Sequence, residues 1–454
     1  MNTTDSNKSK KASKVINAGY NSLGLRKNPF SGQILPSNHP TIPPYGPIRQ
    51  KVENFIDTFL QNQASRGLVF IGDYGTGKTY HLRWMKSQFD EHPNVNVHTI
   101  YLETPGLEPY DLVRGILNEI GEEQIAKGIW NLLQHEITKE IKTNGQEEYL
   151  GQFAYEIEVK PKGRSVRKYN LGQSQMQFKA DYFGRITDDD LLDHRKFLAA
   201  FDKTGRLSRE KLRDHYQRVL FGIHEPAVTN NVAVARELAS ICFYSGAPAL
   251  NSWESLVIPG AGSPKAFPPQ GEPAFLQSVV RVLVKSGVEY LVLFLDEFEK
   301  VPLLQTMTER EAKRYLDTFR MLIDKNWHEL PFAWVLGSNE DAWAWIEKEN
   351  RALPQRIITR VTLPRADDPK LAYYIIRGFL NEARLPDSKL SSDDSIFPFP
   401  DNLLDLIPLA LRRTPRDLVK LCDVILEEAV QERHPKAPVS EQTIATVVES
   451  FSLE

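Results

Sequence analysis

Apolar residues along the chain follow two patterns, short continuous runs and helical spacing. The runs are rich in β-branched and aromatic residues and end at Gly, Pro or acidic residues, which is typical of buried strands. Helical patterns separate the runs, and strands that alternate with helices indicate a parallel sheet with helices on both faces. We therefore predict the α/β fold class, with a parallel αβα core whose strands are Gly67–Asp73, Asn96–Thr104, Glu289–Glu297, Pro331–Asn339 and Arg360–Pro364.

One connection between the predicted strands is much longer than the others. About 185 residues separate Thr104 from Glu289, whereas a crossover needs only about a dozen. The helix predicted at Glu108–Gly121 still belongs to the core and is closed by its C-terminal glycine. We assign residues 122–271 to a large inserted α+β subdomain, which includes the β-like stretch "YLGQFAYEIEVKPKGRSVRKYNL". The core then consists of residues 29–121 and 272–365.

The two ends of the chain differ from this core. Apolar residues of the segment 366–454 keep helical spacing through "PKLAYYIIRGFLNEA", "DNLLDLIPLAL", "TPRDLVKLCDVILEEAVQE" and "SEQTIATVVESF", which predicts a C-terminal α-helical domain. Residues 1–28 begin with a polar, lysine-rich stretch that lacks the apolar region of a secretory signal. We expect this segment to be a disordered tail.

Composition excludes several classes of protein. The 454 residues have a net charge of −3, so any contact with nucleic acid must come from a local patch. Two cysteines are too few for a disulfide scaffold or a four-cysteine zinc site, and they fit a reducing compartment. Because no run of eighteen apolar residues occurs, we expect a cytoplasmic protein without a membrane span.

A phosphate-binding motif follows the first predicted strand. The residues Gly72-x4-Gly77-Lys78-Thr79 match the P-loop pattern and open a helix. Glycines let backbone N–H groups surround a phosphate, and the N-terminus of the helix favours an anion. Lys78 is placed for the β- and γ-phosphates and the Thr79 hydroxyl for Mg²⁺. We expect ATP to be held by Gly72, Asp73, Tyr74, Gly75, Thr76, Gly77, Lys78, Thr79 and Tyr80.

A pair of acids ends the strand predicted at Glu289–Glu297. Asp296 is expected to hold Mg²⁺ together with Thr79, and Glu297 to orient and polarise the attacking water. The second acid is what a hydrolase requires, so the pair favours an ATPase over an enzyme that transfers phosphate.

These motifs resemble the AAA+ ATPase module, with a P-loop after one strand, "DE" after another and a helical lid. The resemblance covers about Asn28–Leu107 and Val288–Glu454. The stretches "KNPF" and "TPRDL" are similar to the branch that holds replication initiators and transposon target-selection ATPases. The stretch "FLQSVVRVLVKSGVEYLVLFLDEFEKV" also resembles the ATPases of bacterial phage-exclusion systems.

The resemblance implies further site residues and a partner. Asn339, with Ser338 as the second candidate, matches the polar residue that contacts the γ-phosphate and water. Arg416 in "TPRDL" matches the lid arginine that reaches the γ-phosphate. Arg356, with Arg360 as the second candidate, matches the arginine that reaches the ATP of a neighbouring subunit. The resemblance therefore implies a homo-oligomer with ATP at its interface.

Two features leave alternatives open. Tyr45 in "PPYGP" either packs on the adenine ring or covers the edge of the sheet. The basic stretch "KPKGRSVRKY" either contacts DNA or forms a solvated hairpin tip. Its basic residues are Lys160, Lys162, Arg164, Arg167 and Lys168.

The function predicted from the sequence is a Mg²⁺-dependent ATPase that acts as a switch. The first hypothesis couples it to a DNA-associated process, in phage defence, in a mobile element or in replication. The alternative is a nucleotide-gated scaffold that controls a protein effector without touching DNA. Both hypotheses include a protein partner.

Overall fold

The computed structural model describes residues 19–31, 40–106, 109–154, 158–159, 167–168, 186–203, 207–222, 228–244, 247–257, 272–303, 308–324, 330–385, 395–432 and 438–452. The chain forms two compact units. Unit 1 comprises residues 1–107, 290–327 and 331–454, and unit 2 comprises residues 108–289 and 328–330.

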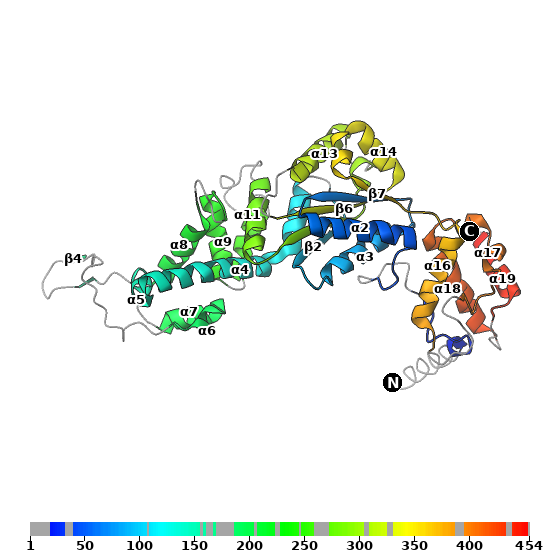
Figure 1. Ribbon diagram of the computed structural model, residues 1–454, viewed down its shortest axis with the longest axis horizontal. Helices are drawn as coiled ribbons and strands as arrows, with labels where there is room; N and C mark the ends of the chain where they lie inside the picture. The colour runs from blue at the N-terminus through cyan, green and yellow to red at the C-terminus, as the bar shows by residue number, and fades with distance from the viewer. Residues whose placement is uncertain are drawn as a thin grey trace, which may run out of the picture. The chain divides into compact units, whose positions relative to one another are not determined.

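A five-stranded parallel sheet forms the centre of unit 1 (Figure 1). The strand order is β2-β5-β6-β1-β7, and every neighbouring pair is parallel. All residues of β5 and β6 are buried. Strands that are covered by helices on both faces are apolar along their whole length, which explains their continuous apolar runs. The five predicted strands are confirmed as β1 (Arg66–Ile71), β2 (Val97–Leu102), β5 (Tyr290–Leu295), β6 (Phe332–Ser338) and β7 (Thr359–Thr362).

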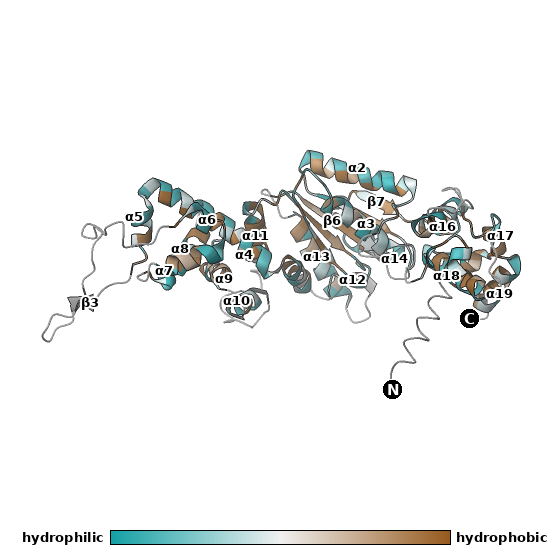
Figure 2. Cartoon of the chain, turned by 90° about the horizontal axis from the view of Figure 1, so that it is seen from below, coloured by the Kyte–Doolittle hydropathy of each residue, from teal (hydrophilic) through white to brown (hydrophobic). Residues whose placement is uncertain are grey.

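Helices pack on both faces of this sheet, so the predicted αβα core is confirmed (Figure 1). Phe55 and Phe59 of α2 join Phe89 of α3 in an apolar cluster with residues of β1, β5 and β6. On the other face, the Phe319 ring of α13 meets the Trp334 ring of β6 at 5.1 Å between centroids. Figure 2 shows the strands as strongly hydrophobic and the helices as amphipathic. The helices of this core are α2 (Gly46–Asn62), α3 (Lys78–Asp90), α12 (Lys300–Leu303), α13 (Glu309–Asp324), α14 (Glu340–Glu349) and α15 (Ala352–Arg356).

The C-terminal part of unit 1 is helical, as predicted, and forms a lid domain. Its helices are α16 (Pro369–Ala383), α17 (Leu403–Leu406), the 3₁₀ helix η2 (Leu409–Leu411), α18 (Pro415–Gln431) and α19 (Glu441–Ser452). The stretch "DNLLDLIPLAL" forms two short helices. Pro408 lacks an N–H group and restricts the residue before it, so the chain forms α17 and η2 instead of one continuous helix.

The expectation that residues 1–28 are a disordered tail is corrected for residues 19–28. Tyr20, Leu23 and Leu25 are buried in the apolar core of the lid. Leu25 forms a β-bridge with Arg384. The Asn28 side chain donates to Asp423 Oδ1 at 2.7 Å. The lysine-rich stretch at the start of the chain lies outside the described residues.

Unit 2 is mainly helical in its described part. Helix α4 (Pro109–Asn144) is interrupted at Gly121, whose φ of 74° is not helical. The glycine therefore ends the predicted helix there, but the chain enters another helix at once. The other described helices are α5 (Gln146–Gly151), α6 (Asp188–Leu191), α7 (His194–Lys203), α8 (Arg209–Leu220), α9 (Val232–Phe243), α10 (Ala247–Val257) and α11 (Glu272–Lys285).

The β-like stretch of unit 2 is only partly β. Strands β3 (Glu158–Val159) and β4 (Arg167–Lys168) pair in antiparallel fashion. The first residues of the stretch, Tyr149–Gly151, belong instead to α5. Glu147 and Glu148 lie in the first turn of this helix, where negative charge is favourable.

No helix in the described part of the chain is long and apolar enough to cross a membrane.

Candidate functional site

The loop from Gly72 to Gly77 joins β1 to α3 and forms a compact turn with its glycines in special positions. Gly75 and Gly77 have φ angles of 84° and 92°, in the region that side chains disfavour. A Cβ on Gly72 would lie 2.5 Å from the Thr76 hydroxyl oxygen. The Thr76 hydroxyl donates to the carbonyl of Asp73 at 2.7 Å. The sequence thus folds into the strand–loop–helix arrangement that a phosphate cradle needs.

Lys78, the first residue of α3, is 8% exposed and turns its ammonium group back over the loop. Its Nζ donates to the carbonyls of Gly72 at 3.0 Å and Asp73 at 3.4 Å. It also forms an ion pair with Glu299 Oε1 at 3.2 Å. Glu299 was not singled out from the sequence, although it lies in the same "DEFEK" segment as the predicted acids.

Asp296 follows β5 and connects three elements of the core. The Thr79 hydroxyl donates to its Oδ2 at 2.6 Å, and the Tyr101 hydroxyl of β2 donates to the same oxygen at 2.9 Å. The backbone N–H of Glu297 donates to Oδ1 at 2.9 Å. Burial and the nearby Asp296 charge raise the pKa of Tyr101, so its hydroxyl stays protonated and remains a donor. Tyr101 is a second residue that the sequence analysis missed.

Thr79 and Asp296 lie together and supply the types of oxygen that Mg²⁺ binds. Mg²⁺ usually takes one or two protein carboxylates and completes its shell with phosphate oxygens and water. The hydrogen bond between the two side chains places a hydroxyl oxygen and a carboxylate beside the P-loop. These two residues therefore fit the group expected there.

Glu297 has an unusual backbone. Its φ of 51° is left-handed, which is uncommon for a residue with a side chain. Its carboxylate forms an ion pair with Lys300, and the side chain is 46% exposed. Glu297 also lines the cavity beside the P-loop. Glu297 therefore combines a strained backbone with a partly exposed carboxylate at the edge of the site.

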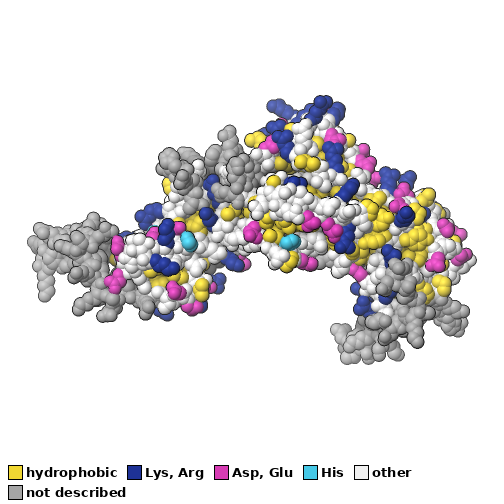
Figure 3. Space-filling view, viewed as in Figure 1, with side chains coloured by type: hydrophobic (Ala, Val, Ile, Leu, Met, Phe, Trp, Pro, Cys, Tyr) yellow, Lys and Arg dark blue, Asp and Glu magenta, His cyan; other side chains and the backbone are white. Residues whose placement is uncertain are grey.

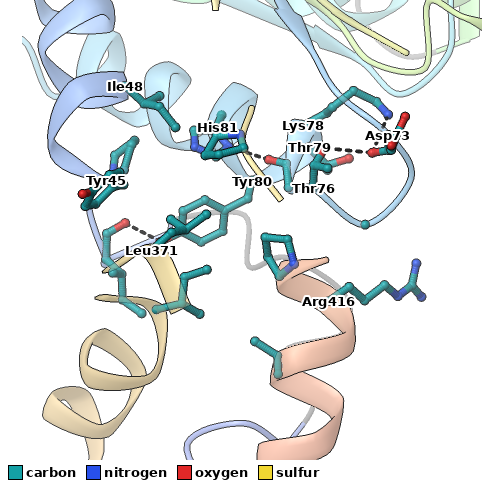
Figure 4. A pocket seen from close by; sticks show the side chains of 18 of the residues that line it. Tyr45, Ile48, Asp73, Thr76, Lys78, Thr79, Tyr80, His81, Leu371 and Arg416 are labelled. Carbon is teal, nitrogen blue, oxygen red and sulfur yellow. Dashed lines mark hydrogen bonds between the residues drawn. The ribbon is translucent and has the colours of Figure 1, made fainter. Parts of the chain in front are cut away.

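A cavity of about 240 Å³ lies between the P-loop, the segment before α2 and the lid. Figure 4 shows Asp73, Lys78 and Thr79 toward one end and Tyr45, Ile48 and Leu371 toward the other. The Tyr45 ring meets the Tyr374 ring edge-on at 5.5 Å. The cavity therefore combines a polar end with an apolar end, as a nucleotide requires.

Two titratable side chains line the middle of the cavity in neutral form. Burial lowers the pKa of His81 to about 4, and its Nδ1 lies 2.7 Å from the Gly77 carbonyl. Because a carbonyl only accepts, this contact requires the tautomer with a proton on Nδ1. Burial raises the pKa of Tyr80, whose hydroxyl donates to the carbonyl of Ile42.

The lid reaches the cavity through the N-terminus of α18. The Arg416 backbone N–H donates to the Gly75 carbonyl at 3.2 Å. Its guanidinium donates to the Tyr74 hydroxyl and lies 5.0 Å from the centroid of the Tyr74 ring. Tyr74 is 78% exposed, so the Arg416 head group remains beside solvent.

A second arginine connects the P-loop to the segment that enters the lid. Arg365 Nε donates to Asp73 Oδ2 at 3.1 Å, and its Nη2 bonds the same oxygen. This residue also escaped the sequence analysis, because nothing local links it to a P-loop aspartate that is 292 positions away.

The structure does not bring the other predicted residues into this cavity. Asn339 uses its side-chain oxygen to cap α14, accepting from the Ala342 N–H at 2.8 Å, and the buried Ser338 precedes it. Arg356 Nη2 donates to Asp324 Oδ2 at 2.9 Å. Arg360 pairs with Glu347. Within the described chain, the cavity is lined by none of these four residues.

The basic residues predicted to contact DNA fall in a stretch of which the structure describes only residues 158–159 and 167–168. Lys160, Lys162 and Arg164 lie outside the described residues. Arg167 and Lys168 lie in β4, whose backbone alone is described.

The fold and the cavity define a P-loop nucleotide-binding class of protein. In agreement, the family model for the AAA domain matches residues 61–158, which include β1, the P-loop, α3 and β2. Residues 61–158 are therefore similar to the AAA domain. The match does not extend to Asp296 or the lid.

Solved structures that match this chain include two proteins of Aeropyrum pernix. The ORC2 protein in its ADPNP–ADP complexes is 11% identical, with 93% of this chain and 71% of that chain covered and a TM-score of 0.45. The ADP form of ORC2 is 12% identical, with the same coverage and a TM-score of 0.43. The ORC1 protein in complex with DNA is 11% identical over 92% of this chain and 68% of that chain, with a TM-score of 0.41. A search of the curated proteins found no match.

Contact between P-loop and lid makes Gly75 sensitive to substitution. A Cβ there would lie 2.7 Å from the Thr414 hydroxyl oxygen, which caps α18, and the φ of 84° would be strained. We expect Gly75→Ala to lower the free energy of unfolding by at least about 1–2 kcal/mol, and to weaken ATP binding. Thermal unfolding with and without Mg-ATP measures both effects.

Gly46→Ala is the matched control for this substitution, because a Cβ on Gly46 meets nothing within 4 Å. Equal melting temperatures and equal ATP affinities for the two variants would contradict the close approach between the P-loop and the lid.

Proposed function

We propose that the protein is a Mg²⁺-dependent ATP hydrolase of the AAA+ type. The observation that carries the proposal is one cavity that joins Lys78, Thr79 and Asp296 to Arg416 of the lid. Lys78 and the P-loop amides would bind phosphates, and Thr79 and Asp296 would hold the metal. Mg²⁺ would neutralise charge on the phosphates as the bond to the γ-phosphate breaks.

Other residues of the chain would activate the water, hold Asp296 in place and bind the γ-phosphate. Glu297 would orient and polarise the attacking water. Tyr101 fixes the Asp296 carboxylate through its hydrogen bond. Arg416 would leave Tyr74 for the γ-phosphate, since a charged acceptor binds a guanidinium more strongly than a neutral hydroxyl. Nucleotide state would in this way change the contact between the lid and the P-loop.

Phosphate release from ATP by the full chain is the direct test of this activity. We expect release in Mg²⁺ and a loss of at least about tenfold when EDTA removes the metal. Equal release with and without the metal would contradict the assignment of Thr79 and Asp296.

We further propose that the nucleotide drives an oligomerising switch in a DNA-associated process, in phage defence, in a mobile element or in replication. The basic stretch 160–168 of unit 2 supports a DNA contact by its charge. The similarity to the AAA domain supports assembly through the ATP interface, where Arg356 or Arg360 would act in trans. Asn339 would contact the γ-phosphate and the attacking water after its side chain changes position.

The alternative function is a nucleotide-gated scaffold that controls a protein effector. One observation favours it. Lys and Arg side chains gather over α13 and α14 in Figure 3, but several of them pair with neighbouring acids. Lys313 contacts Glu309 at 2.7 Å and Glu349 at 2.8 Å. Such ion pairs reduce the net positive charge of this face, and a face with less positive charge attracts DNA less strongly.

A further inference from the structure

The Glu299 side chain, which is 19% exposed, lies beside the P-loop lysine and has no role in the proposed hydrolysis. Its Oε1 is 3.2 Å from Lys78 Nζ. Its Oε2 is buried and has no hydrogen-bond partner among the described residues. Burial raises the pKa of the Glu299 carboxyl, although the Lys78 charge opposes this shift. Lys78 is therefore the main group that stabilises a charge on Glu299.

The Lys78 ammonium already has as many acceptors within reach as it has protons. An ammonium group has three donors and no acceptor. Three acceptors lie within 3.4 Å of Lys78 Nζ, namely the carbonyls of Gly72 and Asp73 and the Glu299 carboxylate. A phosphate oxygen can therefore bind Lys78 directly only if one of these acceptors is released.

Glu299 is the acceptor that can be exchanged with the least disturbance to the loop. The two carbonyls belong to the P-loop, so losing them would change the cradle itself. Glu299 lies between β5 and α12, outside the loop, and a change of its side-chain torsions is enough to move it. A phosphate brings the same sign of charge to the same donor and competes with Glu299 directly.

This exchange has an energetic consequence for nucleotide binding. When Lys78 turns to a phosphate, the largely buried Glu299 carboxylate loses its counter-ion and lies next to a new negative charge. Breaking a buried ion pair by removing one partner is strongly unfavourable. Displacement of Glu299 therefore makes the net free energy of phosphate binding less favourable.

We propose that Glu299 is a positioning residue that holds Lys78 in the nucleotide-free protein and sets the affinity for nucleotides by competing with their β- and γ-phosphates. This inference rests on the proposed nucleotide binding. It predicts that removal of the Glu299 charge tightens nucleotide binding. Removal of an acid that supports the fold of the site or takes part in catalysis would not tighten it.

The test compares Glu299→Gln with the wild-type full chain by calorimetric titration with AMP, ADP and ATPγS in Mg²⁺. Glutamine keeps the size and an acceptor oxygen but removes the charge. We expect ADP and ATPγS to bind roughly tenfold more tightly, the size of one charge-assisted hydrogen bond. AMP lacks the phosphates that reach Lys78, so its affinity is expected to stay unchanged.

Two further variants keep the result interpretable. Glu103→Gln removes an acid whose side chain is 80% exposed and pairs with Arg83 at 3.6 Å, and it is expected to change no affinity. Glu299→Asp keeps the charge on a shorter side chain. We expect it to bind ADP more tightly than wild type but less tightly than Glu299→Gln.

The outcomes separate this inference from the proposed function. Wild-type protein that binds no nucleotide would refute the proposed function itself. Wild-type binding with equal or weaker binding of ADP by both Glu299 variants would overturn the inference. A large fall in kcat with unchanged affinity in Glu299→Gln would also overturn it, because that result identifies Glu299 as the catalytic base.

Discussion

Lys78→Ala is expected to abolish ATP binding. The ammonium is the positive side chain at the centre of the P-loop, and a charge-assisted hydrogen bond contributes about 1.5–3 kcal/mol. Loss of contacts to the β- and γ-phosphates should therefore weaken affinity by at least about a hundredfold, since 1.4 kcal/mol corresponds to a factor of ten. Titration of the variant with a fluorescent ATP analogue in Mg²⁺ measures the loss.

Lys86→Ala is the matched control because Lys86 lies on the same helix and pairs with Asp90 at 2.5 Å, outside the cavity. It is expected to bind ATP as wild type does. Lys78→Ala also leaves Glu299 without its counter-ion, so the variant can lose stability as well as affinity. The double variant Lys78→Ala with Glu299→Gln removes that buried charge, and its affinity reports the phosphate contact alone. ATP binding by the double variant within about threefold of wild type would refute the P-loop assignment.

The sequence was sufficient to predict the elements that are determined locally. Strands β5 and β6 are buried on both faces, so their apolar runs are continuous and easily recognised. The P-loop is a contiguous motif in which glycines adopt backbone angles that other residues disfavour. The helix that follows it can likewise be recognised from consecutive residues. Asp296 could be expected at the site because parallel strands end at the same edge of the sheet.

The partners of these residues depend on contacts between distant parts of the chain. Tyr101 reaches Asp296 because β2 lies beside β5, a pairing that follows only from the strand order. Arg365 meets Asp73 because β7 lies beside β1. Neither residue belongs to a local motif, so sequence patterns gave no reason to select it.

Contacts between distant parts of the chain also explain why the expectation for residues 19–28 had to be corrected. Residues 19–28 lack a long periodic pattern, and their apolar side chains become buried only because the lid offers a core to receive them. Asn339 was chosen for its place after a strand, yet the same place makes it the N-cap of α14. An asparagine before a helix satisfies a backbone donor whether or not it also serves a ligand.

Glu297→Gln is expected to bind ATP normally but to hydrolyse it about 10²–10⁴-fold more slowly, the usual contribution of a general base. The substitution keeps the size of the side chain and removes the charge that would polarise water. Glu309→Gln is the control, since Glu309 is an exposed acid that also pairs with a lysine, Lys313. Steady-state phosphate release measures both variants. Normal turnover by Glu297→Gln would assign the water-positioning role to another acid, and Glu299 would be the next residue to test.

Slow hydrolysis also makes Glu297→Gln the best protein for deciding between the two cellular roles. With Mg-ATP it should remain in the assembled state, whose mass light scattering measures with and without plasmid DNA. Assembly that requires DNA, and that weakens steeply with salt, would support the DNA-associated switch. Assembly that is indifferent to DNA would support the protein-effector scaffold. The nucleotide site would then control a surface that recognises a protein, because an ATP-dependent change in mass without DNA requires contacts between protein chains.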